Sequence, residues 1–193
     1  MKTDLVLAGV GGQGILSIAA TIGMAALKND LYIKQSEVHG MAQRGGDVQS
    51  HMRISSKPIA SDLIPKGKAD LILSVEPMES LRYLPFLKPD GWLVTNTCPY
   101  VNIPNYPELD EVLKQVKKRG NFITIDADDI ALKAGSKRAT NIAMLGAASP
   151  FIDMPFESLE EGIRQIFAKK GDKIIDLNIS ALRAGREFSL ENK

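Results

Sequence analysis

The sequence begins with a short apolar run that leads directly into closely spaced glycines. The run is Leu5 to Ala8, and the segment Gly9-Val10-Gly11-Gly12-Gln13-Gly14 follows it. From residue 15 to residue 28 the apolar side chains recur with helical spacing. A strand, a glycine turn and a helix in this order begin an α/β unit, and this constrains the rest of the fold.

The remaining sequence predicts more strands and helices. Buried-strand patterns occur at residues 31–35, 71–75, 92–95 and 122–125. Residues 48–54 alternate between apolar and polar, which is typical of a half-exposed, antiparallel strand with His51 on its polar face. Helical patterns cover 77–84, 108–119, 126–133, 140–150, 157–169 and 178–191. No repeat or long linker divides the chain, so residues 1–193 predict a single domain. We expect a three-layer Rossmann-like α/β fold with a mostly parallel sheet and at least one antiparallel strand.

Composition excludes several classes of partner and cofactor. The 24 Lys and Arg residues nearly balance 23 Asp and Glu, so neither nucleic acid nor a membrane is expected as a partner. The lone Cys98 cannot supply the thiolates of an iron–sulfur cluster, and two histidines argue against a closed zinc site, so no metal ligands are predicted. Asp4 interrupts the apolar start, which argues against a signal peptide, and a cytoplasmic location is expected.

The glycine segment matches the dinucleotide-binding pattern, in which missing Cβ atoms let backbone N–H groups approach an anion. Its candidate cofactor-binding residues are Gly11, Gly12, Gln13 and Gly14. Glu37, near the end of the second predicted strand, is the matching candidate for a ribose contact. A tight turn that binds no ligand explains the same glycines equally well.

A second loop, residues 37–46, combines a carboxylate, an imidazole and a guanidinium with three glycines. Glu37, His39 and Arg44 can form a network that only braces the turn. Alternatively, Arg44 offers a bidentate fork to a carboxylate or phosphate, and His39 exchanges a proton with the reacting group. His39 and Arg44 are therefore the candidate catalytic residues. Further candidate cofactor-binding residues are Gly40, Gly45, Gly46 and Asn141.

These two loops carry a family resemblance. The segments Gly9–Ile15 and Ser36–Gly46 resemble the gamma-type domain of 2-oxoacid:ferredoxin oxidoreductases. Within that family, the second loop and the segment Glu76-Pro77-Met78-Glu79-Ser80-Leu81-Arg82-Tyr83-Leu84-Pro85 are most similar to the indolepyruvate branch, in which this domain is the beta subunit. The similarity extends over nearly the whole chain, to about residue 186.

The resemblance implies a reaction and a division of labour. The family oxidatively decarboxylates 2-oxoacids with coenzyme A, giving acyl-CoA, carbon dioxide and reduced ferredoxin. Thiamine diphosphate, Mg²⁺ and [4Fe-4S] clusters are then expected on a larger alpha subunit, since this sequence has neither the Gly-Asp-Gly…Asn segment for the metal nor the cysteines. The chain would be a non-autonomous oxidoreductase subunit, with coenzyme A as co-substrate and ferredoxin as electron acceptor.

Three alternatives stay open. The chain could be a gamma subunit for another 2-oxoacid, such as 2-oxoglutarate, pyruvate or a branched-chain acid. It could instead be a stand-alone NAD(P)-dependent Rossmann oxidoreductase that uses the glycine loop, or a binding protein that uses the fold without chemistry.

Overall fold

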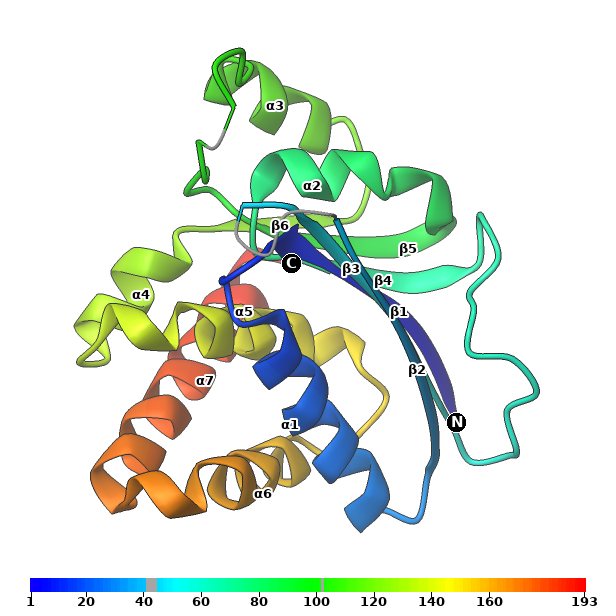
Figure 1. Ribbon diagram of the computed structural model, residues 1–193, viewed down its shortest axis with the longest axis vertical. Helices are drawn as coiled ribbons and strands as arrows, with labels where there is room; N and C mark the ends of the chain where they lie inside the picture. Colours follow the sequence, from blue (N-terminus) through cyan, green and yellow to red (C-terminus); the bar gives the residue numbers. More distant parts are fainter. Residues whose placement is uncertain (41–44, 102) are drawn as a thin grey trace.

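A computed structural model of the chain describes residues 1–40, 45–101 and 103–193. Within them, a mixed sheet has six strands in the order β2-β3-β1-β4-β5-β6 (Figure 1). The strands are β1 (Lys2–Val10), β2 (Tyr32–His39), β3 (Asp47–Ser55), β4 (Ala69–Ser74), β5 (Leu87–Asn96) and β6 (Phe122–Ile125). β1, β4, β5 and β6 run parallel, whereas β3 is antiparallel to both of its neighbours, β1 and β2. The predicted mostly parallel sheet with at least one antiparallel strand is confirmed.

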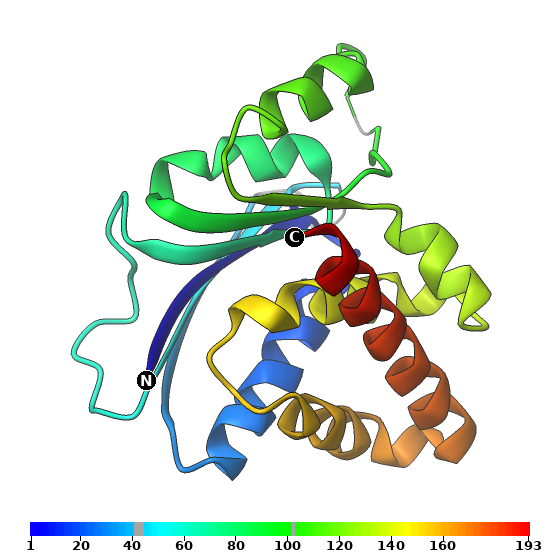
Figure 2. The same cartoon turned by 180° about the vertical axis from the view of Figure 1, so that it is seen from behind.

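Helices cover both faces of this sheet. The α-helices are α1 (Ile15–Lys28), α2 (Pro77–Arg82), α3 (Leu109–Val116), α4 (Ala127–Lys133), α5 (Thr140–Ala148), α6 (Phe156–Phe167) and α7 (Asp172–Asn192). Short 3-10 turns lie at Leu84–Phe86, Lys137–Ala139, Ser149–Phe151 and Ala168–Lys170. Figures 1 and 2 show α2 and α3 on one face of the sheet and α1, α5, α6 and α7 on the other. The three-layer arrangement follows from this distribution.

The alternation of side chains along β1 divides the core between the two faces. Leu5 and Leu7 belong to the larger apolar cluster under α1, α5, α6 and α7. Val6 and Ala8 belong to the smaller cluster with residues of α2, α3 and β5. Successive residues of a strand point to opposite faces, and fully burying one leucine contributes about 1.5–3 kcal/mol. A central strand with helices on both sides buries both of its faces. It therefore needs a continuous run of apolar residues.

The helix of small residues, α5, makes its closest approach to α7. A Cβ added at Gly146 would lie 2.0 Å from the carbonyl oxygen of Leu182, and one added at Gly185 would lie 2.0 Å from that of Ala143. The nearest neighbour of this helix is therefore another helix. Two facing glycines let the backbones touch at this crossing.

Strand β2 is longer than predicted. It continues through His39, so Glu37 and His39 lie on a strand rather than in a loop. The register pairs Glu37 with Ser50 and His39 with Val48 of β3. Backbone hydrogen bonds to a partner strand extend an edge strand whatever its side chains are, so polar residues did not end it.

His51 was expected on an exposed face, and that prediction is wrong. It is buried, because residues 56–68 fold over this part of β3. The backbone N–H of Ile64 donates to His51 Nδ1 at 3.0 Å, and the ring meets Phe86 edge-on. Burial lowers the pKa of His51.

The two predicted helices that correspond to α2 and α4 begin with side-chain caps. The Glu76 side chain accepts a hydrogen bond from the Glu79 backbone N–H, and Pro77 occupies the first turn of α2. Asp126 caps α4 by accepting from the backbone N–H of Asp129. α7 begins at Asp172, six residues before the predicted start.

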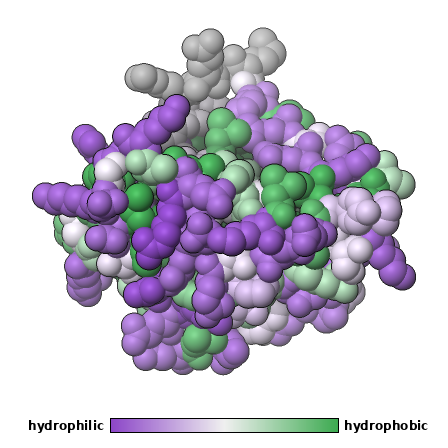
Figure 3. Space-filling model, turned by 90° about the horizontal axis from the view of Figure 1, so that it is seen from below, coloured by the Kyte–Doolittle hydropathy of each residue, from purple (hydrophilic) through white to green (hydrophobic). Residues whose placement is uncertain are grey.

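The surface carries separated apolar patches. Figure 3 views the molecule from the side of α6 and shows hydrophobic areas divided by hydrophilic ones. A shallow groove of about 290 Å³ lies between α1, β2 and α6, and Leu27 beside it is 59% exposed. Among the described residues, no helix has the length and apolar character needed to cross a membrane.

Candidate functional site

The glycine loop turns from the carboxyl end of β1 into α1. Gly14 precedes α1 with φ of 81°, a left-handed conformation that favours glycine. A Cβ at this position would lie 2.7 Å from Nδ2 of Asn141. That same nitrogen donates a hydrogen bond to the Gly14 carbonyl at 3.1 Å. The structure therefore brings Asn141, at the start of α5, onto the glycine loop.

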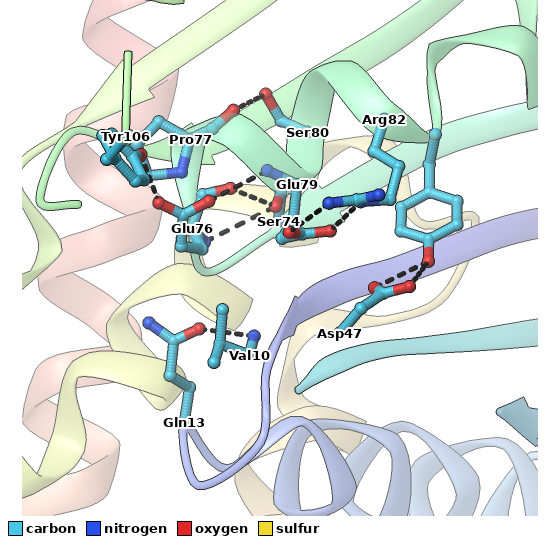
Figure 4. A network of polar contacts seen from close by, with 11 residues as sticks. Val10, Gln13, Asp47, Ser74, Glu76, Pro77, Glu79, Ser80, Arg82 and Tyr106 are labelled. Carbon is cyan, nitrogen blue, oxygen red and sulfur yellow. Dashed lines mark hydrogen bonds and ion pairs between the residues drawn. The ribbon is translucent and has the colours of Figure 1, made fainter. Parts of the chain in front are cut away.

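The side chain of Gln13 stabilises the glycine loop by hydrogen bonds to the backbone (Figure 4). Its Oε1 accepts from the backbone N–H of Val10 at 2.8 Å, and its Nε2 donates to the carbonyl of Val75 at 3.4 Å. Val75 follows β4, so the amide of Gln13 joins the ends of two parallel strands. In this arrangement the Gln13 side chain stabilises the turn.

The two loops identified in the sequence are hydrogen-bonded to each other. The backbone N–H of Gly11 donates to the carbonyl of Gly46 at 2.8 Å, and the N–H of Gly45 donates to the carbonyl of Gly11 at 3.4 Å. The Gly40 N–H donates to the Asp47 carbonyl at 2.7 Å. Arg44 lies outside the described residues. The structure thus places the stem of the second loop directly against the glycine turn.

On one side of the glycine loop lies a cavity of about 400 Å³, here called the His39 pocket. It is lined by Val10, Gly11, Gly12, Gly14, Ile15, Leu16, Ser17, His39 and Val48. The side chain of His39 is 56% exposed, and its Nε2 pairs closely with the Glu37 carboxylate. Glu37 also accepts from Gln35 Nε2 at 3.3 Å, which holds it beside the imidazole. Glu37 and His39 therefore form part of the bracing network, while His39 also faces a cavity.

On the other side lies a cavity of about 380 Å³, here called the cation pocket. Its lining comprises Gly12, Gln13, Val75, Asn96, Cys98, Pro99, Tyr100, Asp128, Lys137, Arg138, Thr140 and Asn141. These residues follow the carboxyl ends of β1, β4, β5 and β6, where open α/β sheets bind ligands. Two cations, one carboxylate and several amides fit an anionic ligand.

The thiol in the cation pocket is not activated. Cys98 Sγ donates to Asp126 Oδ1 at 3.3 Å. Burial, with Asp126 and Asp128 nearby, raises the pKa of Cys98 to about 11. Because the thiolate is the nucleophilic form, Cys98 acts at neutral pH as a hydrogen-bond donor.

A larger, open cavity of about 800 Å³ lies at the other end of β1, beside Met1 to Thr3. Trp92 stacks on Phe151 in its wall, and Lys88 pairs with Asp70 there. Its cations and carboxylates neutralise each other, and it lies at the amino ends of the strands. Size alone therefore does not make it the functional site.

The amino end of α2 carries a fully buried carboxylate (Figure 4). Glu76 is 0% exposed, and besides capping α2 it accepts from the hydroxyl of Tyr106 and from the backbone N–H of Tyr100 at 3.3 Å. Burial and this carboxylate raise the pKa of Tyr106. Three donors satisfy the charge of Glu76, as a buried carboxylate requires.

Comparison with known proteins identifies the family. The family model described as pyruvate ferredoxin/flavodoxin oxidoreductase matches residues 4–188. The chain belongs to this family. It is 40% identical over 202 aligned positions to the indolepyruvate oxidoreductase subunit IorB of Archaeoglobus fulgidus, an alignment that covers 100% of this chain and 98% of that protein.

Other members of the family contain this unit inside longer chains. The ketoisovalerate oxidoreductase subunit VorA of Methanothermobacter thermautotrophicus is 30% identical, and the match covers 96% of this chain but 36% of that subunit. A 2-oxoglutarate:ferredoxin oxidoreductase structure from Magnetococcus marinus, with 2-oxoglutarate, coenzyme A and succinyl-CoA bound, shares the fold with a TM-score of 0.77 at 21% identity. That match covers 98% of this chain and 31% of the other. Family members thus carry the unit either alone or within a larger polypeptide.

Sequence reasoning missed the cations of the cation pocket. Lys137 and Arg138 stand directly before α5, separated from the glycine loop by more than a hundred residues. The sequence did contain an indication of this site, because a basic pair stands just before a helix of small residues. The amino end of a helix favours a bound anion.

Proposed function

We propose that this chain is the smaller subunit of an indolepyruvate:ferredoxin oxidoreductase. The observation that carries the proposal is the end-to-end similarity to IorB, at 40% identity with both chains almost fully covered. In the proposed reaction, the bond between the oxo carbon and the carboxylate of an aryl 2-oxoacid breaks and carbon dioxide leaves. The acyl carbon bonds to the sulfur of coenzyme A, two electrons pass to ferredoxin, and the thiol proton is released.

The cofactors of this reaction are assigned to a larger partner subunit. A [4Fe-4S] cluster needs several cysteine thiolates, and this chain has one cysteine, whose pKa is raised. Thiamine diphosphate and Mg²⁺ are assigned to the same partner. We propose that all 193 residues form one such unit and that the complex is cytoplasmic.

Within the complex, the cation pocket is proposed to hold phosphate groups of coenzyme A. Lys137 and Arg138 provide charge, Asn141 provides an amide, and the amino end of α5 faces the same space. Phosphates bind well to guanidinium groups and to helix amino termini. The donor set therefore fits this co-substrate.

The His39 pocket is proposed to face the reaction centre of the partner. His39 can donate to or accept from a reacting group near neutral pH. Arg44 is proposed to offset carboxylate or diphosphate charge beside it. Neither role needs a cofactor on this chain.

Two rival functions have less support. In the NAD(P)-dependent reading, Glu37 would bind ribose, but its carboxylate is already paired with His39 and Gln35. The Gly11 N–H, which would face the diphosphate, donates to Gly46. A gamma subunit for another 2-oxoacid would share the fold, but the similarity to IorB over the full chain favours indolepyruvate.

The experiment is an assay of the purified complex with indolepyruvate, pyruvate, 2-oxoglutarate and a branched-chain 2-oxoacid. We expect the highest kcat/KM with indolepyruvate, and coenzyme A and ferredoxin should both be required. A higher kcat/KM with another 2-oxoacid would overturn the substrate assignment. Micromolar binding of NAD or NADP to the isolated chain would favour the rival dehydrogenase.

A further inference from the structure

The residue that follows α2 is hydrogen-bonded to the first residue of β3 (Figure 4). The hydroxyl of Tyr83, just after α2, lies 2.7 Å from Oδ1 and 2.6 Å from Oδ2 of Asp47. Tyr83 is 5% exposed, and Asp47 is the first residue of β3. The phenol therefore donates to a carboxylate that stands at the end of the loop.

The backbone on either side of this carboxylate joins two further segments. The carbonyl of Asp47 accepts from Gly40 at 2.7 Å, at the end of β2. The carbonyl of Gly46 accepts from Gly11 at 2.8 Å, in the glycine loop. Residues 46 and 47 therefore connect β2, the glycine loop and α2. These are the elements that hold His39 and the glycine wall of its pocket.

A second buried carboxyl group, on α2, lies in the field of Asp47. Glu79 is 3% exposed, and the negative charge of Asp47 contributes to its raised pKa. Arg82 binds Glu79, with Nε at 2.6 Å and Nη2 at 3.2 Å.

The pKa of Glu79 follows from its surroundings. Burial is the largest cause that raises the pKa of Glu79; Asp47 from β3 raises it further, and Arg82 from α2 opposes the shift. Burial and Asp47 also raise the pKa of Tyr83, so its hydroxyl stays protonated and donates to Asp47 at neutral pH. At the other end of α2, Glu76 is bound to Tyr106.

We propose that Asp47 is a positioning residue, held by Tyr83, that fixes the glycine loop and His39 relative to each other. It acts through the Gly46 and Asp47 carbonyls and does not touch substrate. The activity expected of it rests on the proposed function, whereas its mechanical effect is a property of the chain alone.

The decisive comparison is Tyr83→Phe against Tyr106→Phe. Both changes remove one phenolic hydroxyl that donates to a carboxylate near α2, but only Tyr83 contacts the loop stem. In the complex we expect Tyr83→Phe to lower kcat/KM about tenfold, equivalent to about 1.4 kcal/mol. Tyr106→Phe should stay within about twofold of the wild type. Equal losses in both variants would overturn the proposal.

Amide hydrogen exchange on the full chain separates this proposal from the proposed function. Tyr83→Phe should speed exchange at Gly11 and Gly40 about tenfold relative to Tyr106→Phe, whatever the complex catalyses. Unchanged exchange at both glycines would contradict the positioning role of Asp47. If exchange responds but the wild-type complex has no 2-oxoacid activity, the proposed function fails and the positioning role stands.

Discussion

The two cavities beside the glycine loop have similar volumes, about 400 and 380 Å³, and opposite chemistry. The His39 pocket has apolar walls and one imidazole among its described residues. The cation pocket has two cations, several amides and a thiol whose pKa is raised. One short turn thus separates a surface suited to proton exchange from a surface suited to anion binding. This contrast is the basis for our proposal that the reaction takes place on one side and that the co-substrate binds on the other.

Gly14 is the position where a single change disturbs both pockets. Gly14→Ala should lower the free energy of unfolding by about 2–5 kcal/mol, since it adds left-handed backbone strain of about 1–2 kcal/mol and a clash with Asn141 of about 1–3 kcal/mol. Urea unfolding measures this loss. Gly67→Ala is the matched control, because Gly67 also has positive φ but its Cβ would meet nothing within 4 Å. Equal destabilisation of the two variants would refute the close contact between Gly14 and Asn141, through which the two pockets are coupled.

Replacing the imidazole should affect reaction without affecting recognition. His39→Asn should lower kcat of the complex about 100-fold, equivalent to about 2.7 kcal/mol, and leave the KM for coenzyme A within about twofold. Steady-state kinetics of the assembled complex provide the measurement. Val38→Thr, on the adjacent exposed position of β2, serves as control. If the His39 variant has a normal kcat but lower stability, His39 only braces the turn and takes no part in the reaction.

Removing the cations should have the opposite kinetic signature. Lys137→Ala and Arg138→Ala should each raise the KM for coenzyme A about tenfold and leave kcat nearly unchanged, because each removes a charge-assisted contact worth about 1.5 kcal/mol. Lys133→Ala removes an exposed cation of α4 that does not line the pocket. If the Lys133 variant has the same effect on the KM for coenzyme A, the cations act only through the general positive charge of the surface. The cation pocket is then not a binding site.

The smallest predicted effect is on Cys98. Its alkylation by iodoacetamide should rise with pH around a midpoint of about 11 in the folded chain, because burial disfavours the thiolate. In denaturant the midpoint should fall to about 8.5. Coenzyme A bound in the cation pocket should slow labelling of the assembled complex about threefold. If coenzyme A leaves the labelling rate unchanged, it does not bind beside the Cys98 thiol.

Local patterns predicted much of the fold. Helical spacing identified the buried face of α1, which comprises Ile15, Ile18, Ala19, Ile22, Ala25 and Ala26. The helical patterns at 77–84 and 126–133 predicted α2 and α4, and a central strand buried on both sides explains the apolar run of β1. These features depend on residues within a few positions of each other.

The features that sequence reasoning missed depend on distant segments. His51 is buried because residues 56–68 cover it, and β2 extends because β3 pairs with it. The contact between Asp47 and Tyr83 joins residues 36 positions apart, and Lys137 shares a pocket with the glycine loop although the two are far apart in the sequence. A periodic pattern gives the faces of an element but not the neighbours that cover them.

The dependence of this chain on a larger subunit is tested most directly by reconstitution. The purified chain is assayed for indolepyruvate- and coenzyme A-dependent reduction of ferredoxin, first alone and then with increasing amounts of the cofactor-loaded partner. We expect no turnover by the chain alone and activity that rises to a plateau at a fixed subunit ratio. Turnover by the isolated chain, or full activity of the partner without it, would contradict the account.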